Sequence, residues 1–303
     1  MKVAEDLIKD KNRTLVTIDY DLERVRRVIT DVLKQTSLKD EIDRFGPSVV
    51  GGKMLRARLV LELGDAVGLS SLIGIRLGAA IELLHAASLL HDDIIDGGIE
   101  RRHADALWVS EGTKAAVLIG DLLLSIALGL ILDAGAPRLP LLIRMLRDMC
   151  EAEAEQEFSS VQVHDSWDDC LCIARRKTGS LFGLAAACAA GEDIALADAL
   201  ERAGQDLGTA YQLADDLLDA CPDPSATGKS LGTDAATGKL TAATLPGVTH
   251  PEAVGAIEDL LLSAERELAE WPGVQQRWKL YVEYVIVPLV ARFADLSPMR
   301  MVS

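Results

Sequence analysis

The sequence predicts an all-α protein. Aromatic residues make up only 4% of the 303 residues, whereas Ala and Leu are abundant, and this composition favours helices over strands. Apolar residues recur at helical spacing through most of the chain, and no segment alternates polar and apolar residues strongly enough to indicate a sheet. With 49% hydrophobic residues the chain can bury a large core. No linker marks a second domain, so we expect one helical domain over residues 1–303.

The first helix is expected over about residues 15–38, where apolar residues recur every three or four positions. Gly51 and Gly52 then break the chain before a second helix that carries Lys53 and Arg56 near its start. Free N–H groups and two cations at a helix start can bind an anion. A basic first turn after two glycines is also often a solvated surface, and the residues alone leave both interpretations open.

A nearly all-apolar helix is expected over residues 74–95, and such a helix belongs in the middle of a large helical protein. Its end carries Asp92, Asp93 and Asp96. In a helix, Asp92 and Asp96 project from one face, where like charges repel, so a cation should lie between them. His85 lies two turns earlier on the same face. It is either a hydrogen-bonded core histidine or part of the same site.

The same acidic pattern returns as Asp215, Asp216 and Asp219, near the end of a helix expected over residues 195–220. Two such helices facing each other would form a cage of hard oxygen ligands. That kind of cage suits Mg²⁺, which usually arrives with phosphates.

Two further helices are expected over residues 114–134 and 138–158. The apolar run at 122–132 is too short to span a bilayer and is interpreted as a buried core helix. Asp168 and Asp169 resemble the acidic pairs but lack a third Asp. They stand where a helix begins, so we interpret them as a helix N-terminus and not as a metal site.

Cationic residues follow the acidic motifs or interrupt helices. Arg101 and Arg102 lie in a loop just beyond the first acidic cluster. They either balance its charge or present planar forks matched to phosphate oxygens, and we favour phosphate binding. Gly179 interrupts a helix directly after Lys177 and Thr178. Such a break often accompanies a kink toward a ligand, from which both side chains can contact a phosphate.

A long segment rich in Gly, Thr and Pro, residues 221–247, follows the second acidic cluster. Structureless loops of this length are uncommon unless they are functional or disordered. Lys229 and Lys239 give it cations with which to close over a phosphate, as a lid does. Helices over 252–270 and 274–294 complete the chain. The glutamates between 151 and 157 are interpreted as a mostly solvated face, with Gln156 able to point inward.

The net charge of −16 argues against nucleic acid as a partner, because a backbone-binding surface needs a basic face. Divalent metals bound by the carboxylates would make the local electric field positive. An acidic protein can therefore still bind an anionic small molecule. The five cysteines lack metal-site spacing and are interpreted as reduced thiols of a cytosolic protein. A redox-active Cys170-x-Cys172 pair is the less favoured alternative. The N-terminus mixes charges from its start, so no signal peptide is evident.

The order of these motifs resembles that of the trans-isoprenyl diphosphate synthases, also called the polyprenyl synthetase family. The blocks are GGKMLR at 51–56, His85 before HDDIID at 91–96, RR at 101–102, KTG at 177–179, YQLADDLLD at 211–219, and the GK pairs at 228–229 and 238–239. One DDxxD motif would be a weak signal. The whole series in this order is specific.

The resemblance implies an all-α fold around a deep central cavity, usually as a homodimer. It implies a chain-elongating prenyltransferase that condenses isopentenyl diphosphate head to tail with an allylic diphosphate to give a trans product. It also implies three Mg²⁺ ions bound together with the allylic diphosphate. The six carboxylates that match the metal-binding motifs are Asp92, Asp93, Asp96, Asp215, Asp216 and Asp219.

The resemblance divides the cations and polar residues between the two substrates. Positions that match contacts to the allylic substrate are Arg101, Lys177, Thr178, Gln212 and Lys229, with Lys177, Thr178 and Gln212 as the catalytic candidates. Positions that match contacts to isopentenyl diphosphate are Lys53, Arg56, His85 and Arg102. Lys239 is a further substrate-binding candidate from the loop. Met54 stands where the family usually has an arginine, which removes one cation from the isopentenyl diphosphate side.

Small residues occupy the positions that limit product length in the family. Ala87 and Ser88 lie five and four residues before Asp92, on the wall along which the product would grow. Without a bulky floor there, products of C20 or longer are expected, unless a residue deeper in the cavity closes it. Alternatives on the same fold are a terpene cyclase, a transferase with another acceptor, and a non-catalytic partner subunit of a synthase.

Overall fold

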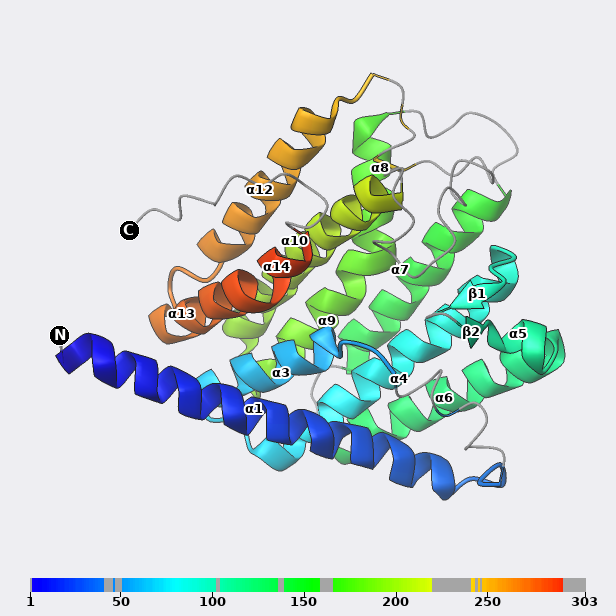
Figure 1. Cartoon of the computed structure of the whole chain (residues 1–303), viewed down its shortest axis with the longest axis horizontal. Helices are drawn as coiled ribbons and strands as arrows, with labels where there is room; N and C mark the ends of the chain where they lie inside the picture. Colours follow the sequence, from blue (N-terminus) through cyan, green and yellow to red (C-terminus); the bar gives the residue numbers. More distant parts are fainter. Residues whose placement is uncertain are drawn as a thin grey trace.

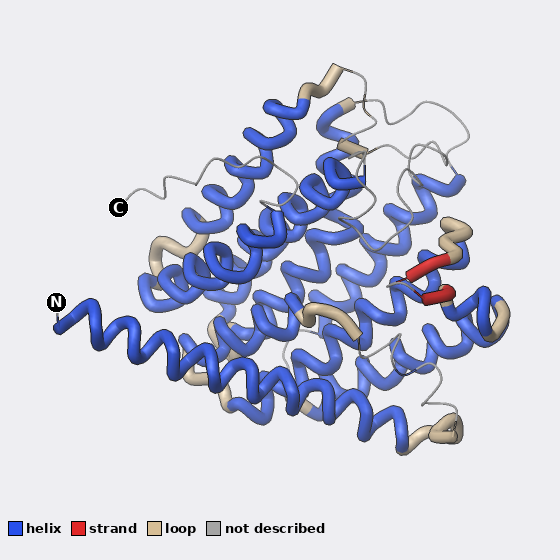
Figure 2. The backbone as a smooth tube through the Cα atoms, viewed as in Figure 1, coloured by secondary structure: helices blue, strands red, loops and turns tan. Residues whose placement is uncertain are grey.

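Helices form nearly all of the described structure (Figure 2). The computed structural model describes residues 2–40, 46, 51–101, 104–135, 139–158, 166–219, 241–242, 245 and 247–290, and only the backbone for 2–16 and Asp219. The all-α prediction is confirmed. Among the described residues, the exception is a short antiparallel hairpin of β1 (Glu100–Arg101) and β2 (Ala104–Asp105), which the sequence did not predict.

The described helices, in chain order, are α1 (Lys2–Lys34), α3 (Leu55–Ala66), α4 (Ser71–Ile95), α5 (Leu107–Ser110), α6 (Thr113–Asp133), α7 (Leu139–Phe158), α8 (Trp167–Ala174), α9 (Ser180–Ala189), α10 (Ile194–Asp219), α12 (His250–Arg266), α13 (Pro272–Tyr281) and α14 (Val287–Val290). Two π-helical turns, η1 (Arg175–Gly179) and η3 (Val282–Ile286), join α8 to α9 and α13 to α14.

The core is centred on α3, α4, α9 and α10. All ten residues of α9 are buried, and most of α4 is buried as its all-apolar sequence predicts. The helix α1 lies along one side of the bundle, where it contacts α3 and α4 (Figure 1). Its apolar stripe, represented by Val25, Ile29 and Leu33, is fully buried at 0% exposure. Amphipathic spacing therefore predicted the buried face of α1 correctly.

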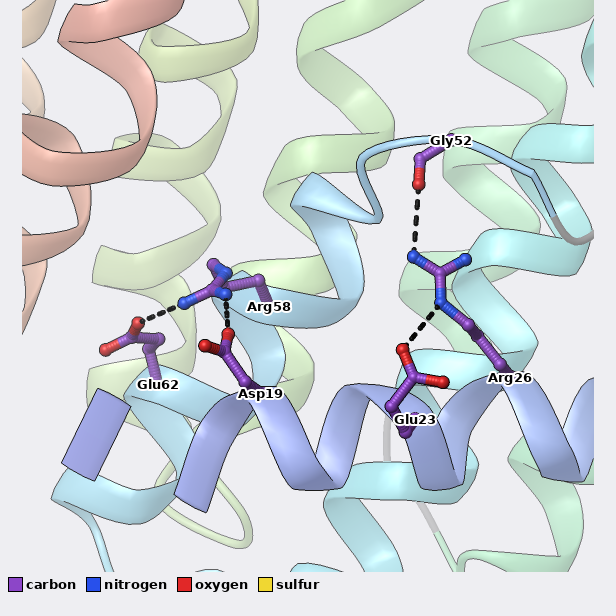
Figure 3. Close-up of polar contacts among 6 residues, drawn as sticks. All are labelled: Asp19, Glu23, Arg26, Gly52, Arg58 and Glu62. Carbon is purple, nitrogen blue, oxygen red and sulfur yellow. Dashed lines mark hydrogen bonds and ion pairs between the residues drawn. The ribbon is translucent and has the colours of Figure 1, made fainter. Parts of the chain in front are cut away.

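An ion pair and a hydrogen bond fix α1 to the start of α3 and the residues before it (Figure 3). Arg58 of α3 forms an ion pair with Asp19 of α1 and lies 3.5 Å from a carboxylate oxygen of Glu62. Arg26 of α1 donates a 3.2 Å hydrogen bond to the carbonyl oxygen of Gly52. Through these contacts α1 holds both α3 and the glycine pair that precedes it.

Glycines let η1 and α9 approach α10 closely. A Cβ atom on Gly208 would lie 2.7 Å from the Cα of Gly179 and 2.9 Å from the carbonyl oxygen of Thr178. A Cβ on Gly204 would lie 2.5 Å from the carbonyl oxygen of Phe182. These neighbours are backbone atoms, which cannot move aside as a flexible side chain can. The absence of side chains at these positions therefore sets the spacing between η1 and α10.

The helix α6 has one buried face and one exposed face. Ala116, Leu123 and Ala127 are fully buried, whereas Leu118 and Leu132 are 68% and 60% exposed. The expectation of a wholly buried core helix at 122–132 was therefore wrong on one side. Two helices, α4 and α6, are long and apolar enough to cross a membrane by length and composition, although α4 is mostly buried within the protein.

The close approach of η1 to α10 predicts a loss of stability in a Gly208→Ala variant. The added methyl group would collide with the backbone of η1, and overpacking of this kind costs about 1–3 kcal/mol. Thermal or denaturant unfolding measures this change in the free energy of unfolding. The control is Gly255→Ala in α12, where an added Cβ meets no atom within 4 Å. That change should be neutral or stabilising by up to about 1 kcal/mol. Equal effects of the two substitutions would contradict the packing argument.

Candidate functional site

Three aspartates lie in different surroundings at the end of α4. Asp92 is partly buried, Asp93 is only 5% exposed, and Asp96 is exposed at the C-cap of the helix. Gly97 follows with φ of 66°, in the left-handed region that ends the helix without strain for glycine. The acidic motif is thus placed at the end of a rigid, buried helix.

Arg101 on β1 is held against the end of α4 by Asp93. Its Nε donates to Oδ2 of Asp93 over 2.6 Å, and its Nη2 donates to Oδ1 over 2.5 Å. The loop between them is fixed by Trp108, whose Nε1 donates a 2.7 Å hydrogen bond to the carbonyl oxygen of Gly98. The pairing of Arg101 with Ala104 in the hairpin fixes the Arg101 backbone. Arg101 is therefore preorganised next to the acidic cluster.

Asp92 lies among other charged groups. Burial and the carboxylate of Glu153 raise the pKa of Asp92 to about 7. Asp96 adds to this rise, whereas the cations of Lys177 and Arg101 oppose it. Side chains from α4, β1, α7 and η1 therefore interact at one end of the bundle.

The predicted helix break at residues 175–179 is a π-helical turn, η1. From this turn Lys177 forms an ion pair with Glu153 and donates a 2.8 Å hydrogen bond to Oε1 of Gln156. The inward orientation of Gln156 is confirmed. Glu151, Glu155 and Glu157 are exposed, as expected of a mostly solvated face, whereas the side chain of Glu153 is the exception at only 14% exposure. Its i, i+3 spacing to Gln156 was the signal that could have placed both residues on one face.

A chain of hydrogen bonds connects η1 to the second acidic cluster. Thr178 donates through its hydroxyl to Oε1 of Gln212 over 2.6 Å, and Gln212 donates through Nε2 to Oδ1 of Asp216 over 2.7 Å. The other carboxylate oxygen of Asp216 accepts a 3.1 Å bond from the backbone N–H of Ala242. The Lys177 cation acts electrostatically on Asp92 of the first acidic cluster, and Thr178 is linked through Gln212 to Asp216 of the second, so adjacent residues of η1 interact with both clusters. Asp215 lies beside Asp216 and is partly buried.

A second cationic centre surrounds Arg56 at the start of α3. The Arg56 guanidinium lies 4.4 Å from the centroid of the Phe182 ring, and its Nε is buried without a hydrogen-bond partner among the described residues. Burial lowers the pKa of Arg56, while Glu82, Tyr211 and Tyr281 favour its charged form. A desolvated cation with an unsatisfied donor is a strong candidate to bind an anion.

The local backbone explains how this centre is built. The helix α3 begins at Leu55, so Lys53 lies just before the helix and is exposed. Met54, at the N-cap, has a left-handed φ of 50° and no side-chain cap. Oε1 of Glu82 from α4 accepts a 2.9 Å bond from the N–H of Ala57 and caps the helix instead.

His85, Ala87 and Ser88 lie on α4 ahead of the acidic cluster. Ala87 is buried at 4% exposure, while His85 and Ser88 are partly buried. The Ser88 hydroxyl donates a 2.9 Å bond to the carbonyl oxygen of His85, one turn earlier. His85 and Ser88 share the helix face of Asp92.

The family of the chain follows from its match to a family model. Residues 41–271 match the model described as polyprenyl synthetase. This range covers most of the chain, from before α3 to the start of α13. The chain belongs to the polyprenyl synthetase family.

Curated relatives and solved structures of this family agree with the match. A (2E,6E)-farnesyl diphosphate synthase from Mycobacterium tuberculosis is 34% identical over 73% of this chain and 60% of the relative. A geranylgeranyl diphosphate synthase from the same species is 38% identical over 68% of this chain and 60% of the relative. The aligned part thus spans about 60% of the length of these relatives. A polyprenyl synthase from Caulobacter crescentus, solved with calcium and isoprenyl diphosphate, superposes with a TM-score of 0.72 at 30% identity, covering 94% of this chain and 89% of the other.

The acidic residues of this family member fit Mg²⁺ that arrives with a diphosphate. Within the described ranges, no group of three His, Cys, Asp or Glu side chains lies close enough to hold an ion by itself. Mg²⁺ usually keeps several waters and binds through one or two carboxylates plus substrate phosphates. Asp92, half-buried beside other carboxylates, supplies a hard oxygen donor of this kind.

Several family positions lie outside the described residues: Arg102, Lys229, Lys239 and the side chain of Asp219. A surface hollow of about 460 Å³ lined by Ala66, Asp193 and Trp271, among others, contains none of the candidate residues. The deep central cavity therefore stays a prediction.

The structure also bears on the Asp168–Asp169 pair and on the Cys170-x-Cys172 pair. Asp168 and Asp169 occupy the first turn of α8 behind the N-cap Ser166, as expected. Burial, together with Asp216, raises the pKa of the Cys170 thiol to about 12, which makes it a poor nucleophile. Cys170 is buried and Cys172 exposed, both as free thiols, so the redox alternative loses support.

The charge around Asp92 predicts a specific pH dependence of stability. Because the folded-state pKa of Asp92 is raised to about 7, the free energy of unfolding should fall as pH rises between about 4 and 7. An Asp92→Asn variant has no carboxylate to ionise and should not lose stability in this way. The difference in melting temperature between the variant and the wild type, both measured in EDTA, should therefore be larger at pH 8 than at pH 5, with the variant the more stable. Asp31→Asn, on the exposed face of α1, removes one charge elsewhere and serves as the control. Parallel pH profiles for the wild type and Asp92→Asn would contradict the argument.

Proposed function

We propose that the protein is a chain-elongating prenyltransferase that condenses isopentenyl diphosphate with an allylic diphosphate. The observation that carries the proposal is the presence of two separate cationic centres around adjacent residues of α10. Tyr211 lies by Arg56, with its ring centroid 5.9 Å from that of Phe182, and Gln212 bonds Thr178 beside Lys177. A cyclase, which needs one diphosphate site, has no use for the second centre.

The first centre, which contains Lys177 and Arg101, suits the diphosphate that is released from the allylic substrate. Breaking the allylic C–O bond produces a carbocation and releases diphosphate, so cations belong where negative charge accumulates. Lys177 and Arg101 lie at the end of α4 and oppose the rise in the Asp92 pKa, which places them near its carboxylate. Two unit charges about 6 Å apart interact by roughly 3 kcal/mol at an effective dielectric of 20. Several such contacts together would lower the barrier substantially.

Metal ions fit the same centre. Aspartates of the two acidic clusters would hold the Mg²⁺, which would supply positive charge to neutralise the leaving diphosphate. We propose three ions, held with the allylic diphosphate. The hydrogen bonds of Gln212 to Thr178 and Asp216 fix the direction of its amide, and we propose that this amide lies beside the leaving group.

The second centre suits isopentenyl diphosphate. Arg56 offers its unsatisfied Nε in a buried setting, with the exposed Lys53 just before the helix. His85 lies on α4, which packs against α3. The buried apolar side chains of the helical core would keep water from the carbocation until the new carbon–carbon bond forms. We propose that the released diphosphate accepts the proton, since no side chain among the described residues stands out as a base.

We propose products of C20 or longer. The support is the small size of Ala87 and Ser88 and the internal hydrogen bond that satisfies the Ser88 hydroxyl. Neither residue extends a bulky ring across the face of α4. We further propose that residues 1–303 form one domain and that the protein is cytoplasmic, in keeping with the free thiols of the described cysteines.

A homodimer is proposed on the exposed face of α6. Leu118 and Leu132 lie four turns apart on one side of this helix and are 68% and 60% exposed. Gly129 lies on the same side, and a Cβ added there would meet no atom within 4 Å. An apolar stripe of this length, left open in one copy, suits coverage by a second copy.

Product analysis tests the proposed activity. The purified protein is incubated with Mg²⁺, labelled isopentenyl diphosphate and C5, C10 or C15 allylic primers, and the dephosphorylated products are separated by chromatography. We expect a ladder ending at C20 or beyond. A stop at C15 would keep the reaction class and refute the product-length argument. Absence of incorporation with every primer would favour a cyclase or a non-catalytic subunit.

The role of Arg56 predicts a selective kinetic defect. Arg56→Leu removes a charge-assisted contact, so the KM for isopentenyl diphosphate should rise about tenfold or more while the KM for the primer changes little. The reciprocal control is Lys177→Met, which should impair use of the primer. A rise in both KM values to the same degree in Arg56→Leu would contradict the assignment of separate centres.

The oligomeric proposal predicts that Leu118→Asp lowers the mass in solution from dimer to monomer, because a carboxylate would be buried at the interface without a partner. Light scattering after size-exclusion chromatography measures the mass. Leu72→Asp, at a position 52% exposed on the start of α4, is the matched control. A monomeric wild type, or an unchanged mass for Leu118→Asp, would refute the use of this face.

A further inference from the structure

We propose that Phe182 and Tyr281 are positioning residues that hold Arg56 in place for isopentenyl diphosphate. The ring of Phe182 holds the guanidinium, and the hydroxyl of Tyr281 holds the backbone at the base of the same side chain. The inference rests on the proposed function, because it assigns two further residues to the second cationic centre. Neither residue belongs to a motif identified in the sequence.

The Arg56 guanidinium is held by a ring and not by a carboxylate. Its central carbon lies over the Phe182 ring, 4.4 Å from the centroid, and Phe182 is fully buried. Arg101 is held differently, because Asp93 accepts two of its N–H groups. An aromatic ring attracts a cation through its quadrupole, so it needs no conventional hydrogen bond to the guanidinium. Phe182 therefore stabilises the charge while Nε of Arg56, which has no hydrogen-bond partner among the described residues, can still donate to an anion.

The Phe182 ring is carried by a rigid part of the core. All ten residues of α9 are buried. This helix lies so close to α10 that a Cβ on Gly204 would be 2.5 Å from the carbonyl oxygen of Phe182. The ring itself packs against Tyr211 of α10, with centroids 5.9 Å apart and planes tilted by 44°. These contacts fix the surface on which the Arg56 guanidinium rests.

Tyr281 of α13 holds the backbone next to Arg56. Its hydroxyl donates a 2.8 Å hydrogen bond to the carbonyl oxygen of Leu55, the first residue of α3. Tyr281 is fully buried, and burial raises the pKa of its hydroxyl well above the usual value. The hydroxyl therefore keeps its proton and remains a donor. Through this contact a helix near the end of the described chain supports the helix start that carries Arg56.

The start of α3 depends on supports from other helices. Met54 at the N-cap has a left-handed φ of 50° and provides no side-chain cap. Glu82 of α4 accepts the N–H of Ala57 instead, and Arg26 of α1 holds the loop just before the helix. The two proposed residues act between these points, from α9 and α13. Arg56 is therefore oriented before a ligand binds, which lowers the cost of ordering it in the complex.

Steady-state kinetics with both substrates distinguish positioning from packing. Phe182→Leu keeps a buried apolar side chain and removes the ring, so the KM for isopentenyl diphosphate should rise about fivefold. The KM for the allylic primer and kcat should stay near their wild-type values. Phe182→Tyr retains the ring and should restore the KM. Tyr281→Phe removes only the hydroxyl and should raise the same KM about threefold.

Leu184→Ala is the control for lost packing in the same helix. Leu184 is fully buried and lies two residues from Phe182, so it is turned by about 200° to the other side of α9. This substitution should lower the melting temperature and leave both KM values near those of the wild type. Should Phe182→Leu fail to fold, Phe182→Met takes its place, because methionine adapts to irregular space in a core.

A double-mutant cycle adds a second readout. If Phe182 acts through Arg56, then Phe182→Leu should cause no further rise in the KM for isopentenyl diphosphate in an Arg56→Leu background. The same cycle applies to Tyr281→Phe. A full additional rise in that background would show that either residue affects the substrate by another route, and would overturn its assignment.

Failure of the proposal is distinguishable from failure of the proposed function. If Phe182→Leu lowers the melting temperature and leaves the KM for isopentenyl diphosphate unchanged, the ring only packs the core, and the proposed reaction stands. Equal rises in both KM values would also overturn the proposal, because the effect would not be selective for one substrate. If the wild-type protein incorporates no isopentenyl diphosphate with any primer, the proposed function itself falls, and the positioning roles fall with it.

Discussion

The candidate site depends on the close approach of η1 to α10. No side chain separates Gly179 from Gly208, so the two backbones can come near enough for Thr178 to hydrogen-bond Gln212. The π-helical turn presents Lys177 and Thr178 toward different acidic clusters. A wider spacing would break this connection, and the ends of α4 and α10 would lose their common link. The charged groups of the site can therefore come together only because these two backbones pack closely.

The charged groups are arranged around this rigid centre with partners on several helices. Asp93 holds Arg101, Glu153 and Gln156 hold Lys177, and Asp216 holds Gln212. Each group that would contact diphosphate is thereby oriented before any ligand binds, which limits the cost of reorganisation during the reaction. Arg56 differs, because its guanidinium rests on Phe182 and its Nε has no partner among the described residues. This difference supports separate roles for the two centres.

Local sequence patterns predicted most of the fold. They failed where contacts between distant segments determine which side chains are buried or paired. The apolar periodicity of α1 and the all-apolar character of α4 gave their burial correctly, and Gly179 marked the break at η1. Alternating charge suggested that Glu153 is solvated, yet its burial depends on Lys177 approaching from a distant segment. The exposed face of α6 has the same composition as a buried one, so sequence could not distinguish them. Arg101 was expected beside the acidic cluster, but its pairing with Asp93 depends on a hairpin too short to leave a strand pattern.

The central claim is that one chain binds two diphosphate substrates at once, on either side of Tyr211 and Gln212. Native mass spectrometry of the protein with Mg²⁺, isopentenyl diphosphate and an allylic thiolodiphosphate, which cannot ionise readily, tests this directly. The account predicts a complex that holds one molecule of each per chain. Mutual displacement of the two ligands, with only one bound per chain, would contradict it.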